Sequence, residues 1–290
     1  MSILVIGSTG TIGSLVVQGL VAQGAKVSAL VRQPGKATLP AGVDAVVGDL
    51  TDVASLRRAM AGVRTLFLLN ALVPDELTQS LQALNVAREA GIERIVYLSV
   101  IHADQYPEVP HFTSKHTVER MIETLGLPAT VLRPAYFMQN DIGIQPVIEG
   151  FGVFPMPIGP AGVAMVDARD IADVAVAELL RRDRAAEALP AITLDVAGPE
   201  VFTGASATAV WSQALGRPIH YGGDDVVAFE AQLVQNHVPA WMAYDLRLMM
   251  ERIQQVGQVP AAGAVQQLED ILGRPLRTYP AFVAERVKKD

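Results

Sequence analysis

Short apolar segments alternate with helix-like patterns along most of the chain. The apolar segments are nearly continuous and rich in β-branched residues, which is typical of strands covered on both faces of a parallel sheet. They occupy residues 3–6, 26–31, 43–47, 65–69, 94–99, 129–132 and 191–196. The expected helices between them occupy residues 11–23, 55–60, 75–90, 112–125 and 167–182. This alternation requires crossover connections, so we predict the α/β class with a doubly wound parallel sheet.

The character of the sequence changes after about residue 137. Proline and glycine punctuate residues 146–162 densely, and further helices are expected at residues 203–215, 225–235 and 241–256. The last helix carries an apolar stripe, formed by Met242, Leu246, Met249, Ile253 and Val256. We interpret the stripe as a core-facing surface, and a substrate wall or partner surface is the alternative. We predict a larger domain from residues 1–140 and 163–200, and a smaller, mostly helical lobe from residues 141–162 and 201–290.

A glycine-rich turn lies between the first expected strand and the first expected helix. Gly7 allows a sharp turn, Gly10 lets the backbone approach a pyrophosphate, and Gly13 allows close packing of helix on sheet. The helix N-terminus offers free N–H groups to the phosphates. The sequence therefore predicts a dinucleotide site in the larger domain, made by Gly7, Thr9, Gly10, Thr11, Ile12 and Gly13.

The end of the second expected strand indicates which dinucleotide is bound. A site for NAD(H) places Asp or Glu here, whereas this chain has Arg32, with Lys36 close behind. A guanidinium can bind a 2′-phosphate through two parallel hydrogen bonds, and a carboxylate would repel it. We therefore predict NADP(H) as the cofactor, and an arginine that merely faces solvent is the alternative.

Composition narrows the remaining function classes. The formal net charge of −7 disfavours nucleic-acid binding. The chain has no cysteine and its histidines lack metal-ligand spacing, so we expect neither disulfides nor a metal site. The apolar start is too short for a signal peptide, and no segment reaches the roughly 20 apolar residues of a membrane span. We expect a soluble cytoplasmic protein without a membrane partner.

These motifs resemble the NmrA-like family of atypical short-chain dehydrogenases/reductases, which have an extended-type Rossmann fold. The resemblance extends over nearly the whole chain. Besides the glycine turn it is carried by Val31-Arg32, Lys36, Gly48-Asp49-Leu50-Thr51-Asp52, Ser55-Leu56, Gly62-Val63, Lys115, Glu119, Leu132-Arg133-Pro134-Ala135, Met138-Gln139-Asn140, Asp170-Ile171-Ala172-Asp173, Gly273-Arg274-Pro275 and Phe282. By this resemblance Asp49 and Leu50 border the adenine, and Leu69 and Asn70 lie along the cofactor. Tyr136 is implied near the nicotinamide.

The resemblance also implies a set of catalytic positions. Short-chain reductases use Ser, Tyr and Lys, with the last two spaced Tyr-x-x-x-Lys on one helix. Ser99 and Lys115 occupy the Ser and Lys places, but the Tyr place is His111. Either His111 moves the proton, which imidazole does well near neutral pH, or the acceptor needs no strong acid. In a third interpretation catalysis has been lost.

Two functions follow from these interpretations. The first is an NADPH-dependent oxidoreductase that transfers hydride to a small quinone-like or unsaturated acceptor. The second is a non-catalytic NADP(H) sensor that acts through a regulatory protein partner. The sequence leaves the acceptor and the oligomeric state open.

Overall fold

The computed structural model describes residues 2–287 and has a seven-stranded sheet at its centre, in the order β3-β2-β1-β4-β5-β6-β8. The strands are β1 (Ile3–Val5), β2 (Val27–Val31), β3 (Asp44–Val47), β4 (Thr65–Leu68), β5 (Arg94–Leu98), β6 (Ala129–Pro134) and β8 (Ile192–Val196). β1 pairs in parallel with both β2 and β4, and the pairings onward to β3 and to β6 are parallel too. The predicted doubly wound α/β class is confirmed.

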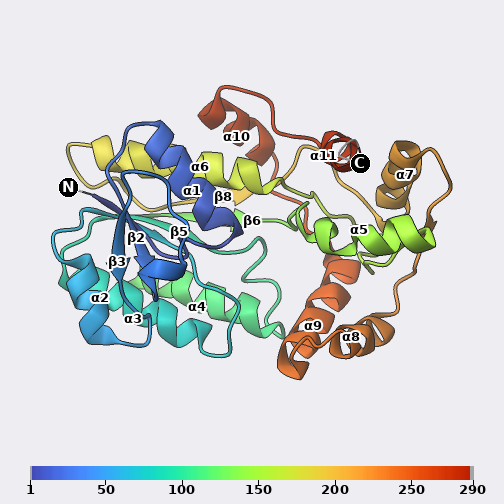
Figure 1. The fold of residues 1–290 in the computed structure, drawn as a ribbon, viewed down its shortest axis with the longest axis horizontal. Coiled ribbons are helices and arrows are strands. Elements are labelled where there is room, and N and C mark those ends of the chain that lie inside the picture. The colour runs from blue at the N-terminus through green and yellow to red at the C-terminus, as the bar shows by residue number, and fades with distance from the viewer. Residues whose placement is uncertain (1, 288–290) are drawn as a thin grey trace. The chain divides into compact units, whose positions relative to one another are not determined.

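The strand order reverses between β1 and β4, where the chain returns from the β3 edge to the other side of β1. In doubly wound sheets the ligand site lies at the carboxyl ends of the strands beside such a reversal. The helices of this region are α1 (Thr11–Ala22), α2 (Val53–Met60), α3 (Glu76–Glu89), α4 (Pro110–Thr124) and α6 (Ala168–Arg184). α1 and α6 cover one face of the sheet, and α2, α3 and α4 cover the other (Figure 1).

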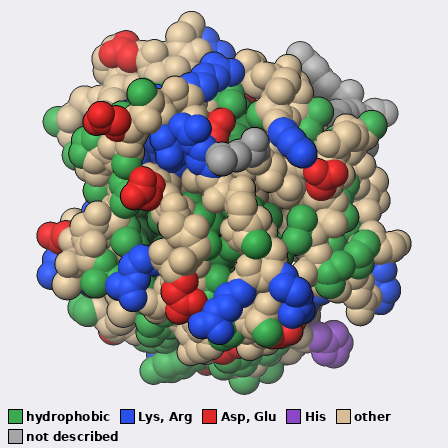
Figure 2. Space-filling model, turned by 90° about the vertical axis from the view of Figure 1, so that its left-hand side faces the viewer, with side chains coloured by type: hydrophobic (Ala, Val, Ile, Leu, Met, Phe, Trp, Pro, Cys, Tyr) green, Lys and Arg blue, Asp and Glu red, His purple; other side chains and the backbone are tan. Residues whose placement is uncertain are grey.

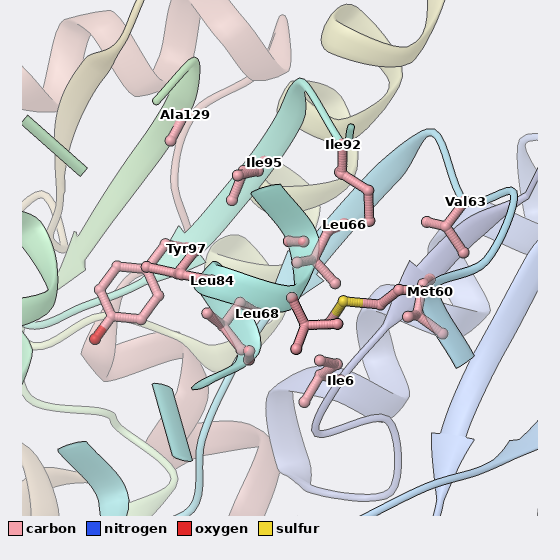
Figure 3. Close-up of a cluster of buried hydrophobic side chains, with 14 of the residues drawn as sticks. Ile6, Met60, Val63, Leu66, Leu68, Leu84, Ile92, Ile95, Tyr97 and Ala129 are labelled. Carbon is pink, nitrogen blue, oxygen red and sulfur yellow. The ribbon is translucent and has the colours of Figure 1, made fainter. Parts of the chain in front are cut away.

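The hydrophobic core beneath α2 and α3 holds the site-bearing strands in place. Leu66 and Leu68 of β4 and Ile6, just after β1, meet Met60 of α2 and Leu84 of α3 (Figure 3). All five side chains are at most 1% exposed. One sequence expectation is wrong here, because β3 is not covered on both faces: it lies at one edge of the sheet, and Val47 is 56% exposed.

The described chain divides into two compact units. The first contains residues 2–100, 114–133 and 169–194, and the second contains residues 101–113, 134–168 and 195–287. The second unit holds a two-stranded sheet and most of the later helices. Its elements are α5 (Asn140–Phe151), β7 (Val153–Phe154), α7 (Gly204–Leu215), β9 (His220–Tyr221), α8 (Val226–Gln235), α9 (Ala240–Val256), α10 (Ala264–Leu272) and α11 (Tyr279–Val287).

Helix α5 runs into the segment that proline and glycine punctuate densely, where no helix is predicted from the sequence. Pro146 lies inside it, and Gly152 ends it with a left-handed backbone. Of the helices among residues 2–287, none is both long and apolar enough to cross a membrane. Basic and acidic side chains are interspersed on the face shown in Figure 2.

Candidate dinucleotide site and neighbouring polar groups

The glycine turn between β1 and α1 is shaped by close contacts that leave no room for a side chain at Gly7 or at Gly13. Gly7 has a φ of +77°, and a Cβ there would stand 2.7 Å from the carbonyl oxygen of Leu69. A Cβ on Gly13 would overlap the carbonyl oxygen of Gly7. The Ser8 hydroxyl donates to the carbonyl of Leu30 at 2.9 Å and so ties the turn to β2. The turn is therefore fixed by its own packing.

The N-terminus of α1 presents backbone N–H groups that no side chain caps. Gly10 is the N-cap residue, and neither a side-chain cap nor an acidic residue occurs in the first turn. Thr11 is exposed, whereas Ile12 and Gly13 are buried against the sheet. The first N–H groups of a helix lack intrahelical partners and carry a partial positive charge. This end of α1 suits an anionic ligand such as a pyrophosphate.

A cavity of about 920 Å³ opens in the first unit at this turn. It brings together most residues that the sequence predicts to hold a cofactor. Those on its wall are Gly7, Thr9, Gly10, Arg32, Lys36, Asp49, Leu50, Leu69 and Asn70. A drug-sized ligand occupies a pocket of roughly 300–1,000 Å³, so the cavity suits a large extended ligand.

The wall near β2 is basic. Arg32 follows β2 and Lys36 ends the short 3₁₀ helix Pro34–Lys36, and both side chains are exposed. The Asp49 carboxylate lies on the wall of the same cavity. Two hydrogen bonds from Thr51 lower the pKa of Asp49, and the positive charge of the Arg32 guanidinium lowers it further. Asp49 thus stays ionised while its Oδ1 atom accepts both hydrogen bonds from Thr51.

Asn70 contributes unpaired polar atoms to the same cavity. It follows Leu69 at the end of β4 and is 5% exposed. Within residues 2–287 neither its Nδ2 nor its Oδ1 atom has a hydrogen-bond partner. Burial of such an amide costs about 1–3 kcal/mol unless a partner arrives. The amide therefore supports a polar ligand here.

Lys115 and Ser99, the predicted Lys and Ser of the catalytic set, are both engaged by buried carboxylates in the first unit. The Lys115 ammonium lies 2.8 Å from Oε1 of Glu76, which is 4% exposed in the first turn of α3. The Ser99 hydroxyl donates to Glu119 at 2.5 Å, and Arg133 forms an ion pair with the same carboxylate. Sequence reasoning did not assign Glu76 to the site.

His111 is the second residue of α4, and its partner also went unnoticed in the sequence. Its Nδ1 lies 2.5 Å from Oδ2 of Asp245, which is on α9 in the second unit and is 2% exposed. Asp245 belongs to the predicted helix over residues 241–256, next to the apolar stripe. An acid directly beside such a stripe is the signal that the sequence offers.

Tyr136 lies on a different cavity from the one at the glycine turn. This second cavity, of about 330 Å³, is enclosed by residues of the second unit. Its wall includes Leu246 and Met249 from the predicted apolar stripe, together with Phe229 and Leu233 of α8. The predicted contact of Tyr136 with the cofactor stays a prediction. Across residues 2–287, no group of His, Cys, Asp and Glu is arranged to hold a metal ion.

Comparison with known proteins gives concordant matches. The model of the NmrA-like family matches residues 1–272. The chain is 33% identical over 285 residues to an NAD(P)H azoreductase of Xenophilus azovorans, with 97% of this chain and 96% of the relative covered. It is 32% identical over 289 residues to a (4-alkanoyl-5-oxo-2,5-dihydrofuran-3-yl)methyl phosphate reductase of Streptomyces griseus, with 99% and 98% covered.

A solved structure with the same fold holds a cofactor. The NADPH-dependent quinone oxidoreductase of Escherichia coli, complexed with NADPH, superposes with a TM-score of 0.84 at 25% identity. The alignment covers 99% of this chain and 98% of the other. These matches confirm the resemblance drawn from the motifs: the chain belongs to the NmrA-like family.

Proposed function

We propose that this protein is an NADPH-dependent oxidoreductase that reduces a small, uncharged, unsaturated acceptor such as a quinone. The observation that carries the proposal is the cavity at the glycine turn, with Arg32 and Lys36 on its wall. A relative and a solved structure that match nearly the whole chain are named as an NAD(P)H azoreductase and an NADPH-dependent quinone oxidoreductase, which supports the same class of reaction.

The residues of the cavity fit NADP(H) along its length. The N–H groups at the start of α1 would bind the pyrophosphate, and the glycines keep side chains out of its way. Arg32 and Lys36 would bind the 2′-phosphate that distinguishes NADP(H) from NAD(H). The unpaired amide of Asn70 would donate and accept hydrogen bonds further along the cofactor. When bound, the nicotinamide supplies the hydride.

Lys115 is suited to hold ribose hydroxyls. An ammonium group has three N–H donors, and Glu76 holds the ammonium of Lys115 by an ion pair. Glu76 also fixes where the ammonium lies, because both side chains are largely buried. Gln79 lies one turn after Glu76 on α3 and lines the cavity at the glycine turn. The ion pair of Lys115 with Glu76 therefore lies in the same part of the first unit as this cavity.

His111 is the proposed proton donor in the place of the usual Tyr, one helical turn before Lys115 on α4. Imidazole exchanges protons near neutral pH, which suits an acceptor that gains a proton together with the hydride. The mostly apolar cavity of the second unit, with Phe229, Leu233 and Met249 on its wall, suits an uncharged ring-bearing molecule.

A cofactor titration followed by a turnover assay tests the proposal. NADPH and NADH are titrated into the wild type, Arg32→Ala and the control Arg58→Ala, which alters an exposed arginine of α2 that does not line the cavity. Arg32→Ala should raise the Kd for NADPH about 10- to 100-fold, the value of a charge-assisted pair, and leave the Kd for NADH nearly unchanged. Equal affinity of the wild type for both cofactors would refute NADP(H) preference.

Turnover is then followed by the absorbance of NADPH with a panel of quinones and azo dyes. The proposal is supported if the wild type oxidises NADPH in the presence of an acceptor and if Lys115→Ala and His111→Ala each slow this oxidation. Tight NADPH binding without turnover across the panel would refute it and favour the alternative, a sensor of NADP(H) that acts through a protein partner.

A further inference from the structure

Asp245 holds both the ring and the backbone of His111. Its Oδ2 lies 2.5 Å from Nδ1 of the imidazole, and its Oδ1 accepts the backbone N–H of His111 at 3.3 Å. Both residues belong to the second unit, and only 3% of the Asp245 side chain is exposed. A carboxylate so deeply buried is destabilising unless its oxygens have partners. His111 provides a partner for each oxygen.

This pairing fixes which ring nitrogen carries the proton. A carboxylate oxygen only accepts hydrogen bonds, so the Nδ1 that faces it must be the donor. The exchangeable nitrogen is then Nε2, on the opposite side of the ring. The ring also packs edge-on against buried Phe112 at 4.7 Å between centroids, and 12% of the His111 side chain is exposed. The ring is therefore held in one orientation with limited access to solvent.

We propose that Asp245 is a positioning residue: it keeps Nδ1 of His111 protonated and so reserves Nε2 for delivering a proton to the reduced acceptor. The inference rests on the proposed oxidoreductase function. In the step, one end of the acceptor's double bond takes the hydride from NADPH and the other end takes the proton from Nε2. The π bond breaks, NADPH is oxidised, and the imidazolium becomes a neutral imidazole that keeps its Nδ1 proton. Solvent then reprotonates Nε2.

The contacts predict a specific effect of Asp245→Asn. The backbone N–H of His111 can only donate, so it will hold the oxygen of the new amide at the Oδ1 position. The amide NH₂ then faces Nδ1 and donates a hydrogen bond to it. Because Nδ1 must accept this bond, the neutral imidazole carries its proton on Nε2 instead. The substitution thus reverses the tautomer without changing the size of the side chain. It also disfavours the imidazolium, because two donors would face each other.

The experiment combines an imidazole spectrum with kinetics. ¹⁵N-histidine NMR of the full-length protein, with His111→Ala used for assignment, should show protonated Nδ1 in the wild type and protonated Nε2 in Asp245→Asn. With NADPH and a quinone, Asp245→Asn should lower kcat about 10²- to 10⁴-fold, the usual contribution of a general acid, at nearly constant KM. Glu251→Gln, a half-exposed acid of the same helix, is the control and should change neither readout.

Two further results decide the interpretation. In the double variant Asp245→Asn/His111→Ala, kcat should fall no lower than in His111→Ala alone, because both changes remove the same proton donor. A wild-type ring that carries its proton on Nε2 alone, with Nδ1 unprotonated, or an unchanged kcat in Asp245→Asn, would overturn the proposal. Absence of turnover in the wild type would overturn the proposed function instead, while the NMR spectrum would still report whether Asp245 sets the tautomer.

Discussion

Asp141 of α5 should make the stability of the protein fall as the pH rises through weakly acidic values. Its side chain is fully buried in the second unit, where its oxygens accept hydrogen bonds from the hydroxyls of Tyr136 and Tyr279. The Trp211 indole donates to the Tyr279 hydroxyl at 2.8 Å. Burial raises the pKa of Asp141 from 3.8 to about 6, although these hydrogen bonds oppose the rise.

The sign and size of the effect follow from the two pKa values. Between pH 3.8 and about 6 the folded protein retains a proton on Asp141 that the unfolded chain has released. Stability falls with pH wherever the folded state binds more protons, so it is highest below pH 3.8 and levels off above about 6. A difference of about two pKa units, at about 1.4 kcal/mol each, predicts a loss of about 3 kcal/mol from this group.

Urea unfolding at a series of pH values from about 4 to about 7 measures the effect for the wild type and Asp141→Asn. The free energy of unfolding of the wild type relative to the variant should fall by about 2.5 kcal/mol across this range, because the amide of the variant does not titrate. Asp44→Asn, on the exposed edge strand β3, corrects for general effects of removing an aspartate. A wild-type minus variant difference that stays constant or rises with pH would refute the reasoning.

Three further outcomes are expected. Gly13→Ala should abolish measurable NADPH binding or destabilise the fold, seen by cofactor titration and thermal unfolding, because its Cβ would overlap the Gly7 carbonyl oxygen. Arg182→Met should lower the free energy of unfolding by about 3–5 kcal/mol, measured in urea, because the buried guanidinium donates to Thr130 and to two backbone carbonyls. Met249→Glu should raise the KM for a quinone about 10-fold and leave the Kd for NADPH unchanged, because it places a charge in the apolar cavity of the second unit. A parallel change in both constants would contradict the proposal that the acceptor binds in this cavity.

The central sheet was largely predictable from local sequence. Each strand of the sheet is a short apolar segment next to a helical pattern. The spacing of the glycines is typical of the turn between a strand and a helix. The position of Arg32 beside the glycine turn was predictable, because Arg32 directly follows a strand that neighbours the turn in the sheet. The exposure of Val47 was not predictable, because whether a strand lies at the edge depends on the order of the whole sheet.

The polar pairs could not be predicted, because they join residues far apart in the chain. Asp245 lies 134 residues beyond His111, and nothing near either residue specifies that they meet. Glu76 reads as an ordinary acid in the first turn of a helix, although its burial and its contact with Lys115 distinguish it in the structure. Helix α5 could not be predicted from the sequence, because Pro146 and its glycines lower helix propensity and tertiary packing overrides that preference.

The N-terminus of α1, which no side chain caps, affects how the protein tolerates mutation. Peptide N–H groups neither titrate near physiological pH nor vary with the amino acid, so the grip on a pyrophosphate would be the same in acid and in base. Replacing the exposed Thr9 or Thr11 by any residue except proline keeps every one of these donors. Selection could therefore remodel the proposed acceptor cavity of the second unit while the proposed phosphate site, being made of backbone, is inherited intact.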